Sequence, residues 1–307
     1  MMPLIDRDGS LRKGKAAIRI VAPTLSRIVD YGLYIVDRIL TEQPIKEMSD
    51  VRIATVFPFL HLTEMLDALQ ILLLGPAPIP ARLQARSIFE ATLIVEYILK
   101  EDTQRRASAF ILCQIKELIA ISEKFDKDTP AGKRFEQSIK KDSAAFGWSP
   151  TWRDTKAEVS FMHAILERPF FERARTEFPI VARKMNKSRP SWFSFFNGPT
   201  NRRELAERVG RSGQYALLYD YWSGTAHVSD LYRQLGEGHG EGVGARQLRD
   251  PREIIATAKI AFGLFVDASE LIVATYLPDQ VASHIEWVKA VVLKALKGIS
   301  ELLKKQK

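Results

Sequence analysis

Apolar residues recur at helical spacing along almost the whole chain. Six long helices follow from this spacing, with expected bounds of about 24–40, 45–74, 81–100, 103–124, 251–277 and 279–304. The stretch GPAPIP at 75–80 and Pro278 separate neighbouring helices, and Pro58 predicts a kink in the second helix. No run alternates as a strand does, and no Asn-Gly hairpin joins two apolar runs. The pattern therefore predicts an all-α fold.

The middle of the chain, residues 125–200, is more broken than the rest. Prolines divide it into short helices and loops, and they are Pro130, Pro150, Pro169, Pro179, Pro190 and Pro199. We expect one helical domain over 1–307, a multi-helix bundle with core helices in 45–124 and 201–305. Residues 125–200 would lie over this core as an irregular helical and loop insertion, or cap.

Two further helices and a loop are expected after this insertion. Asn201 and Glu204 have capping-box spacing, which predicts a helix that begins near Asn201. A second helix, about 212–231, contains most of the aromatic stretch YDYWSGTAHVSDLY at 219–232. The stretch GEGHGEGVG at 236–244 follows, and its glycines predict a flexible surface loop.

The composition is that of a folded protein, with 46% hydrophobic and 27% charged residues among 307. One cysteine, Cys113, excludes an internal disulfide and a cysteine-based metal site, and indicates a reducing compartment. The first twenty residues show no secretory signal. Lys259, Asp267 and Glu270 interrupt the longest apolar segment, 254–277, so it predicts a core helix rather than a membrane span. We expect a soluble, cytoplasmic protein.

The net charge of +8 is unevenly distributed. From Arg168 to Arg211, eleven Arg or Lys residues stand against four Glu, a local excess of +7. Aromatic residues are interleaved with them, namely Phe170, Phe171, Phe178, Trp192, Phe193, Phe195 and Phe196. Two interpretations remain open. The segment could follow a phosphate backbone and stack bases, or it could be a solvated face beside a local apolar cluster.

A polar stripe crosses the expected helix 81–100. Arg86, Glu90 and Tyr97 lie along it, with apolar faces on both sides. Surface pairs at this spacing gain more when the acid comes first, so the order Arg86 then Glu90 indicates another role. A buried arginine must be paired and hydrogen-bonded. The pair is therefore either a structural salt bridge or an arginine that Glu90 orients toward an anionic substrate group.

A second group of polar residues lies on the expected helix 212–231. Tyr219, Trp222, Ser223 and His227 share one side of it. Histidine is the usual acid or base near neutral pH, and Ser223 could orient its ring or act as a nucleophile. No glycine-rich elbow precedes Ser223, which argues against a serine hydrolase. The other interpretation of His227 is a core histidine bonded to a carboxylate or carbonyl.

Metal, nucleotide and DNA binding have little support. The histidines are scattered, with no metal-binding spacing, so neither a metal nor a cofactor is expected. The glycine loop 236–244 lacks a Walker lysine and a preceding strand. Residues 202–222 resemble a helix-turn-helix element, but the second helix presents apolar and aromatic residues such as Leu218 where base-reading polar ones are needed.

Both polar groups resemble motifs of a known family. The pattern R-S-x-x-E at Arg86, Ser87 and Glu90, and Y-x-x-x-S-x-x-x-H at Tyr219, Ser223 and His227, resemble the DUF5677 family of uncharacterised bacterial helical proteins. The resemblance covers roughly residues 50–275 and implies no established activity.

A looser similarity is to the HEPN superfamily, many members of which are metal-independent RNases in defence and toxin systems. The chain lacks the superfamily's Arg and His on one helix, so Arg86 would supply the cation from another helix. The similarity implies that His227 moves the 2′-hydroxyl or leaving-group proton while Arg86 stabilises the phosphorane charge. The basic segment 168–211 would hold the RNA.

We therefore expect a HEPN-like, metal-independent RNase that acts in stress or phage defence as a homodimer, with RNA as partner and no membrane. The expected catalytic residues are His227, Arg86, Glu90 and Ser223. The expected substrate-binding residues are Tyr97, Tyr219, Trp222, Arg202 and Arg203. The alternative is a non-enzymatic helical protein that binds a partner or ligand, with the same Arg, Glu, Ser and His residues as a buried network.

Overall fold

The computed structural model describes residues 5–45, 48–142, 150–222, 235–237, 243–245 and 249–305. In this part the chain is all-α apart from a short two-stranded ribbon, which confirms the expected fold class. Two compact units are present. The first comprises residues 1–101 and 206–307, and the second comprises residues 102–205.

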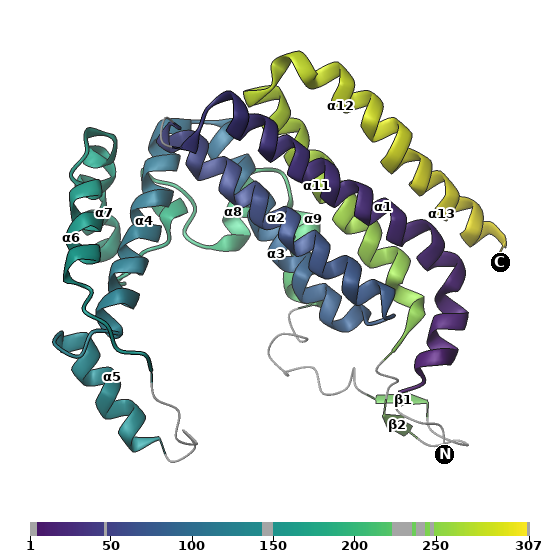
Figure 1. Ribbon diagram of the computed structural model, residues 1–307, viewed down its shortest axis with the longest axis horizontal. Helices are drawn as coiled ribbons and strands as arrows, with labels where there is room; N and C mark the ends of the chain where they lie inside the picture. Colours follow the sequence, from purple (N-terminus) through teal and green to yellow (C-terminus); the bar gives the residue numbers. More distant parts are fainter. Residues whose placement is uncertain are drawn as a thin grey trace. The chain divides into compact units, whose positions relative to one another are not determined.

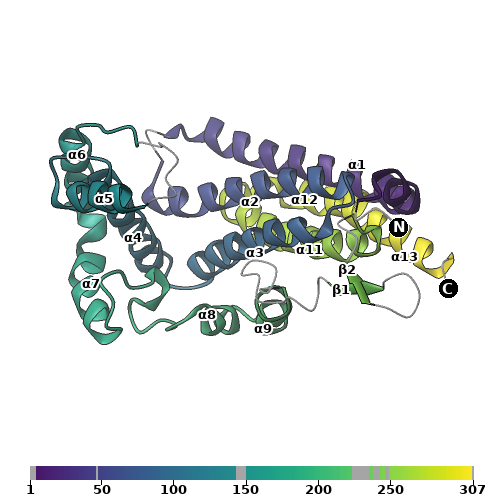
Figure 2. The same cartoon turned by 90° about the horizontal axis from the view of Figure 1, so that it is seen from below.

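The first unit is a bundle of long helices (Figure 1). They are α1 (Arg7–Glu42), α2 (Asp50–Leu74), α3 (Pro78–Lys100), α11 (Ile254–Tyr276), α12 (Val281–Val288) and α13 (Lys294–Lys305). Shorter turns flank them, namely Pro251–Glu253 (η6), Pro278–Gln280 (η7) and the π-helical Lys289–Leu293 (η8). α2 lies between α1 and α3, α11 packs against all three, and α13 packs on α1 (Figure 2).

A glycine brings α1 close to its neighbours in this bundle. A Cβ atom on Gly32 would lie 2.7 Å from Thr63 Oγ1 and 3.2 Å from Phe265 Cε2. Thr63 is buried on α2, and its hydroxyl donates to the Phe59 carbonyl at 3.0 Å. The close approach therefore depends on the absence of a side chain at residue 32.

Most expected helix bounds agree with the structure, but three starts differ. α2 begins at Asp50 rather than near residue 45, after the N-cap Ser49, and the starts of α1 and α3 also differ for local reasons. α1 begins at Arg7 rather than near residue 24, because the Asp6 carboxylate accepts from Gly9 N at 2.8 Å and caps the helix there. α3 begins at Pro78, inside the stretch expected only to end α2. Proline suits the first helical turn, where its missing N–H costs nothing.

α2 is the one described helix long and apolar enough to cross a membrane, with a mean hydropathy of 1.4 over its most apolar window. Its buried residues, among them Phe59, Leu62 and Leu66, pack against α1, α3 and α11. That packing is what a core helix requires. α11, the segment expected to be a core helix, likewise has buried residues at helical spacing from Ile254 to Val273.

The second unit has its own helices and core. Its elements are α4 (Thr103–Lys124), α5 (Pro130–Lys141), α6 (Lys156–Leu166), α7 (Glu172–Lys184) and the short turns Pro169–Phe171 (η2) and Trp192–Ser194 (η3). The bounds of α4 agree with the expected 103–124. However, α4 belongs to this unit, whereas the sequence placed it with the core helices and put the boundary at residue 125.

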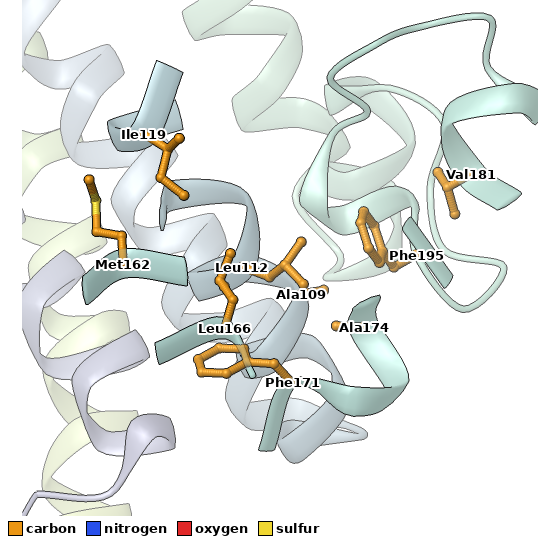
Figure 3. Close-up of a cluster of buried hydrophobic side chains, with 9 residues drawn as sticks. All are labelled: Ala109, Leu112, Ile119, Met162, Leu166, Phe171, Ala174, Val181 and Phe195. Atoms are coloured by element: carbon orange, nitrogen blue, oxygen red, sulfur yellow. The ribbon is translucent and has the colours of Figure 1, made fainter. Parts of the chain in front are cut away.

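The core of the second unit explains why α4 belongs there. Its buried residues come from α4, α6, α7 and the segments beside them (Figure 3), and they are Ala109, Leu112, Ile119, Met162, Leu166, Phe171, Ala174, Val181 and Phe195. Phe170, Phe178 and Phe196 are partly buried against this cluster. Of the aromatic residues interleaved with the basic ones, Phe171 and Phe195 are thus buried in this core, and the three partly buried rings pack against it.

The chain from Arg202 onward contains shorter elements. α8 (Arg202–Arg208) begins at the expected capping box, where Glu204 N donates to Asn201 Oδ1 at 3.0 Å. α9 (Ser212–Tyr215) and the π-helical turn η4 (Ala216–Tyr221) follow.

A two-stranded antiparallel ribbon lies in the glycine-rich stretch. It pairs β1 (Leu235–Glu237) with β2 (Val243–Ala245), where the sequence predicted only a flexible loop. Glycines at Gly236 and Gly244 face each other in this pairing. They carry no side chains, so the alternating pattern that signals a strand is absent there.

Candidate functional site

The site is built on one face of α3. Arg86 and Glu90 lie one turn apart, and Arg86 Nε donates to Glu90 Oε1 at 3.3 Å. The two side chains are 20% and 33% exposed, so the pair is neither in the dry core nor free in solvent. The expected Arg86–Glu90 contact is therefore present, and it lies where a ligand from solvent could reach it.

Tyr219, from the π-helical turn η4, closes over this pair. Its hydroxyl donates to Glu90 Oε1, and the Arg86 guanidinium lies over its ring, 4.1 Å from the ring centre. The ring also stacks on Tyr215 at 4.6 Å and meets the edge of Phe89 at 6.2 Å. Tyr219 is buried, so these contacts hold the Arg86 side chain in one orientation.

The electrostatics keep Arg86 charged. Burial lowers the pKa of Arg86, but the Tyr219 hydroxyl and the negative charge of Glu90 outweigh it. The pKa of Arg86 therefore lies above its ordinary value. A permanently charged, planar and oriented guanidinium suits recognition of phosphate or carboxylate.

Arg82, which the sequence analysis did not single out, lies one turn before Arg86 on α3. It is 4% exposed and forms an ion pair with Glu253 of η6. The Trp222 ring lies 5.3 Å from its guanidinium, and its Nε is buried without a hydrogen-bond partner in the described part of the chain. The four-residue spacing of Arg82, Arg86 and Glu90 was the signal that could have found it.

The π-helical turn explains how Tyr219 and Trp222 both reach α3. Trp222 N donates to the Leu217 carbonyl at 3.1 Å, five residues back rather than four. The wider turn alters which side chains face a neighbour, and such turns occur often at functional sites. As a result, Tyr219 meets Arg86 while Trp222 meets Arg82.

A second arginine network anchors the start of this segment, and sequence reasoning missed it. Arg211 is 8% exposed and forms a two-pronged contact with buried Glu96 of α3, with Nη2–Oε1 at 2.8 Å. It also donates to Asp267 of α11 at 2.9 Å and to Gln214. Burial lowers the pKa of Arg211, but Glu96 and Asp267 outweigh this and raise it. Arg211 thus ties α9 to α3 and α11.

A cavity of about 670 Å³ borders this network, within the first unit. Lys100 lines it and contacts Glu96 at 3.2 Å. Gly210 and Gly213 also line it, and a Cβ atom at either position would meet nothing within 4 Å. The carboxylates of Glu96 and Asp267 neutralise the buried Arg211 guanidinium, so we assign Arg211 a structural role.

The other expected site residues are placed as follows. Trp222 is buried beside Arg82. Tyr97 lies about two turns beyond Glu90 on α3 and is 3% exposed, so solvent scarcely reaches it. Arg202 and Arg203 are exposed at the start of α8 and belong to the second unit. Ser223 and His227 lie outside the described residues.

Metal-ligating side chains do not converge in the part of the chain that the structure describes. No group of three His, Cys, Asp or Glu residues there could hold an ion. His61 and Glu64, three residues apart on α2, form an exposed pair with 3.6 Å between Nδ1 and Oε2.

The comparisons with known proteins give one match. No curated protein and no solved structure matches the chain. A family model described as "Family of unknown function (DUF5677)" matches residues 53–242, more than half of the chain. The match includes Arg86 and Glu90 as well as Tyr219, Ser223 and His227. The chain therefore belongs to the DUF5677 family.

Proposed function

We propose that the chain is a HEPN-like, metal-independent ribonuclease in which Arg86 contacts the scissile phosphate and His227 moves protons. One observation carries the proposal. The Arg86 guanidinium is oriented by Glu90 and Tyr219 yet remains partly exposed, on the α3 face where Tyr219 and Trp222 also lie. His227 follows Trp222 by five residues in the chain.

The chemistry needs no metal. The RNA 2′-hydroxyl loses its proton to a base and attacks the adjacent phosphorus, and the bond to the 5′-oxygen breaks as that oxygen gains a proton. The imidazole of His227 would take or give one of these protons. Arg86 would stabilise the negative charge that develops on the non-bridging oxygens.

Other residues at the site would have positioning roles. Glu90 and Tyr219 hold Arg86 in place, and Arg82 adds a second positive charge that Glu253 partly neutralises. Ser223 would orient the His227 ring. In this proposal the protein is cytoplasmic, acts as a homodimer, and degrades RNA during stress or phage infection.

The decisive experiment is RNA cleavage in EDTA by the full chain. His227→Ala is expected to lower the rate by about 10²- to 10⁴-fold, the usual contribution of an acid or base. Arg86→Ala is expected to lower it by about 10²- to 10³-fold, the usual cost of losing one charge-stabilising donor. His163→Ala removes an exposed histidine of α6 and serves as the matched control. Equal rates for His227→Ala and His163→Ala would exclude this mechanism.

Arg86→Lys and Tyr219→Phe separate orientation from charge. Lysine keeps the charge but loses the planar fork, and phenylalanine removes the hydroxyl that donates to Glu90. We expect both variants to lower the cleavage rate by about tenfold, with the loss in the rate constant rather than in RNA affinity. A loss confined to affinity would make Arg86 a binding residue only.

The second candidate is a non-enzymatic protein that binds a ligand or partner. The observation in its favour is that Arg82, Arg86 and Arg211 are each paired with a carboxylate. Under this alternative, neither wild type nor His227→Ala cleaves RNA, and the variants lower the melting temperature instead. Cleavage in EDTA that depends on His227 would exclude it.

A further inference from the structure

The positive charge of the chain is concentrated in the second unit. Residues 102–205 contain 20 of the 45 Arg and Lys residues but only 13 of the 37 acidic ones, so they carry +7 of the net +8. Some of these acidic residues form ion pairs with arginines of the same unit. Glu117 pairs with Arg189 at 2.7 Å, and Glu167 pairs with Arg175. This unit is therefore the part of the chain suited to a polyanion.

A cavity of about 650 Å³ lies wholly within the second unit. α4 contributes Arg105, α7 contributes Arg173 and Thr176, and the segment after η3 contributes Phe196 and Asn197. A volume of this order is typical of a small-ligand site. None of these residues belongs to the candidate site on α3.

The wall formed by Phe196 and Asn197 has a strained backbone. Both residues have left-handed conformations, with φ of 56° and 59°. Such a conformation costs a phenylalanine about 1 kcal/mol or more, whereas asparagine tolerates it better. Neighbouring contacts maintain it. Phe196 N donates to Glu177 Oε1 at 3.2 Å, and the preceding Phe195 is buried in the core cluster (Figure 3).

The strained turn places polar and aromatic groups at the cavity. The Phe196 ring is partly exposed, with the Arg105 guanidinium 5.7 Å from its centre, and Asn197 is exposed. Strain that the surroundings maintain is a common feature of binding sites. The cavity therefore offers an aromatic face and an amide beside a cation.

Two arginines supply positive charge to this cavity. Arg173 is exposed and has no ion pair among the described residues, while Arg105 pairs with Asp102 at 3.3 Å. Of the two carboxylates that line the cavity, Glu177 already accepts from Phe196 N. Glu172 is exposed and repels an anion, so a ligand at this cavity needs contacts beyond those to its phosphate.

We propose that this cavity binds one nucleotide of single-stranded RNA. Arg105 and Arg173 would hold a phosphate, the base would lie against Phe196, and the Asn197 amide would contact the base edge. The choice of RNA as the polyanion rests on the proposed function. A free mononucleotide has the same chemistry, and the experiment below distinguishes the two sources.

The test is binding of a labelled oligouridine whose 2′-hydroxyls are methylated, followed by fluorescence anisotropy with the full chain. Methylation blocks attack by the 2′-oxygen, so binding is measured apart from cleavage. Arg105→Ala and Arg173→Ala are each expected to weaken binding by about tenfold, the equivalent of one charge-assisted hydrogen bond. Each should also lower the slope of log Kd against log salt by about 0.7.

Arg134→Ala is the matched control, because it removes an exposed arginine of α5 in the same unit, away from the cavity. We expect its affinity to stay within about twofold of wild type, since a lone surface charge contributes little. If Arg134→Ala weakens binding as much as Arg173→Ala does, binding is diffuse and the proposed site is wrong.

Asn197→Gly tests the nucleotide contact without adding backbone strain, because glycine adopts positive φ freely. It should reduce the preference among oligouridine, oligoadenosine and oligocytidine while leaving the melting temperature unchanged. An unchanged preference would overturn the assigned amide contact. Competition by uridine monophosphate at concentrations similar to those of the oligonucleotide would identify a mononucleotide site rather than an RNA site.

The outcome for this cavity is separable from that for the ribonuclease. If Arg173→Ala loses binding while unprotected RNA is never cleaved, the cavity proposal stands and the proposed function fails. If wild type cleaves RNA in EDTA but Arg105→Ala and Arg173→Ala bind protected RNA as wild type does, the cavity proposal fails alone.

Discussion

Arg86 shows how a half-buried side chain can be held in one orientation and still reach solvent. Glu90 and Tyr219 replace much of the water that a free guanidinium would have, and together they raise the pKa of Arg86 despite its burial. At the same scale, His284 of α12 shows the opposite case. It is 2% exposed, and its Nε2 has no hydrogen-bond partner in the described part of the chain. Burial therefore lowers its pKa.

His284 predicts a pH dependence of stability. Its neutral ring contacts Tyr31, with Nδ1 and the hydroxyl 3.2 Å apart, and burial raises the pKa of Tyr31 to about 12. Because the folded-state pKa of His284 is below 6.5, its contribution to stability is complete above that pH and declines as the pH falls below it.

The measurement is the free energy of unfolding in urea at pH values from about 5 to 8, the range in which histidine usually titrates. His284→Gln should lose less stability than wild type on acidification, since glutamine does not titrate. His163→Gln, at an exposed position, is the control. Parallel pH profiles for wild type and His284→Gln would contradict the assignment.

At the scale of elements, α3 is the organising helix of the site. Along its length it contacts η4 through Arg86 and Glu90 and η6 through Arg82. Through Glu96 it contacts Arg211 at the start of α9, and Arg211 in turn contacts Asp267 of α11. These contacts hold the segment that precedes Ser223 against one helix.

Gly32→Ala should destabilise the first unit. The added methyl group would lie 2.7 Å from Thr63 Oγ1, and Thr63 is buried, so α1 must move away from α2. Overpacking of this kind costs about 1–3 kcal/mol, which chemical denaturation can measure. Gly213→Ala, where a new methyl group meets nothing within 4 Å, is the control. Equal stabilities would show that the helices adjust freely.

Arg211→Met should cost about 3–5 kcal/mol, because it leaves the buried Glu96 carboxylate without its main partner. The double variant Glu96→Gln with Arg211→Met should recover much of that loss, since the uncompensated charge is gone. Denaturation of the two variants gives the comparison. If the double variant is less stable than Arg211→Met alone, Arg211 stabilises the fold mainly through its contact with Asp267.

At the scale of the whole molecule, the chain has two cores and one charged unit. Each unit buries its own apolar cluster, and +7 of the net charge of +8 lies on residues 102–205. Such a chain is not expected to unfold in a single cooperative step.

Calorimetry should therefore show two transitions that respond to different substitutions. Phe171→Ala, in the core of the second unit, should lower one melting temperature, because it removes a fully buried ring worth about 3–5 kcal/mol. Gly32→Ala should lower the other. If both variants shift one shared transition equally, the two units unfold together.

The sequence predicted the features that depend on contacts between residues close together in the chain, and it missed those that depend on contacts between distant residues. α4 and the Asn201 capping box were located correctly because helical spacing and caps are local. The Arg86–Glu90 pair was found for the same reason, since four-residue spacing places side chains side by side. Arg211 was missed because its partner Glu96 is 115 residues away. The roles of Ser223 and His227 remain predictions.

By itself, then, the sequence determined the helical class, most helix bounds and one polar pair, since backbone hydrogen bonds within a helix join residues four apart. Tertiary structure decided that Tyr219 closes over Arg86, that Glu253 pairs with Arg82, and that α4 packs in the second unit. These contacts depend on how helices distant in the chain pack together and on a π-helical turn that changes which side chains face α3. The spacing of residues along one helix determines neither the packing of distant helices nor the position of such a turn.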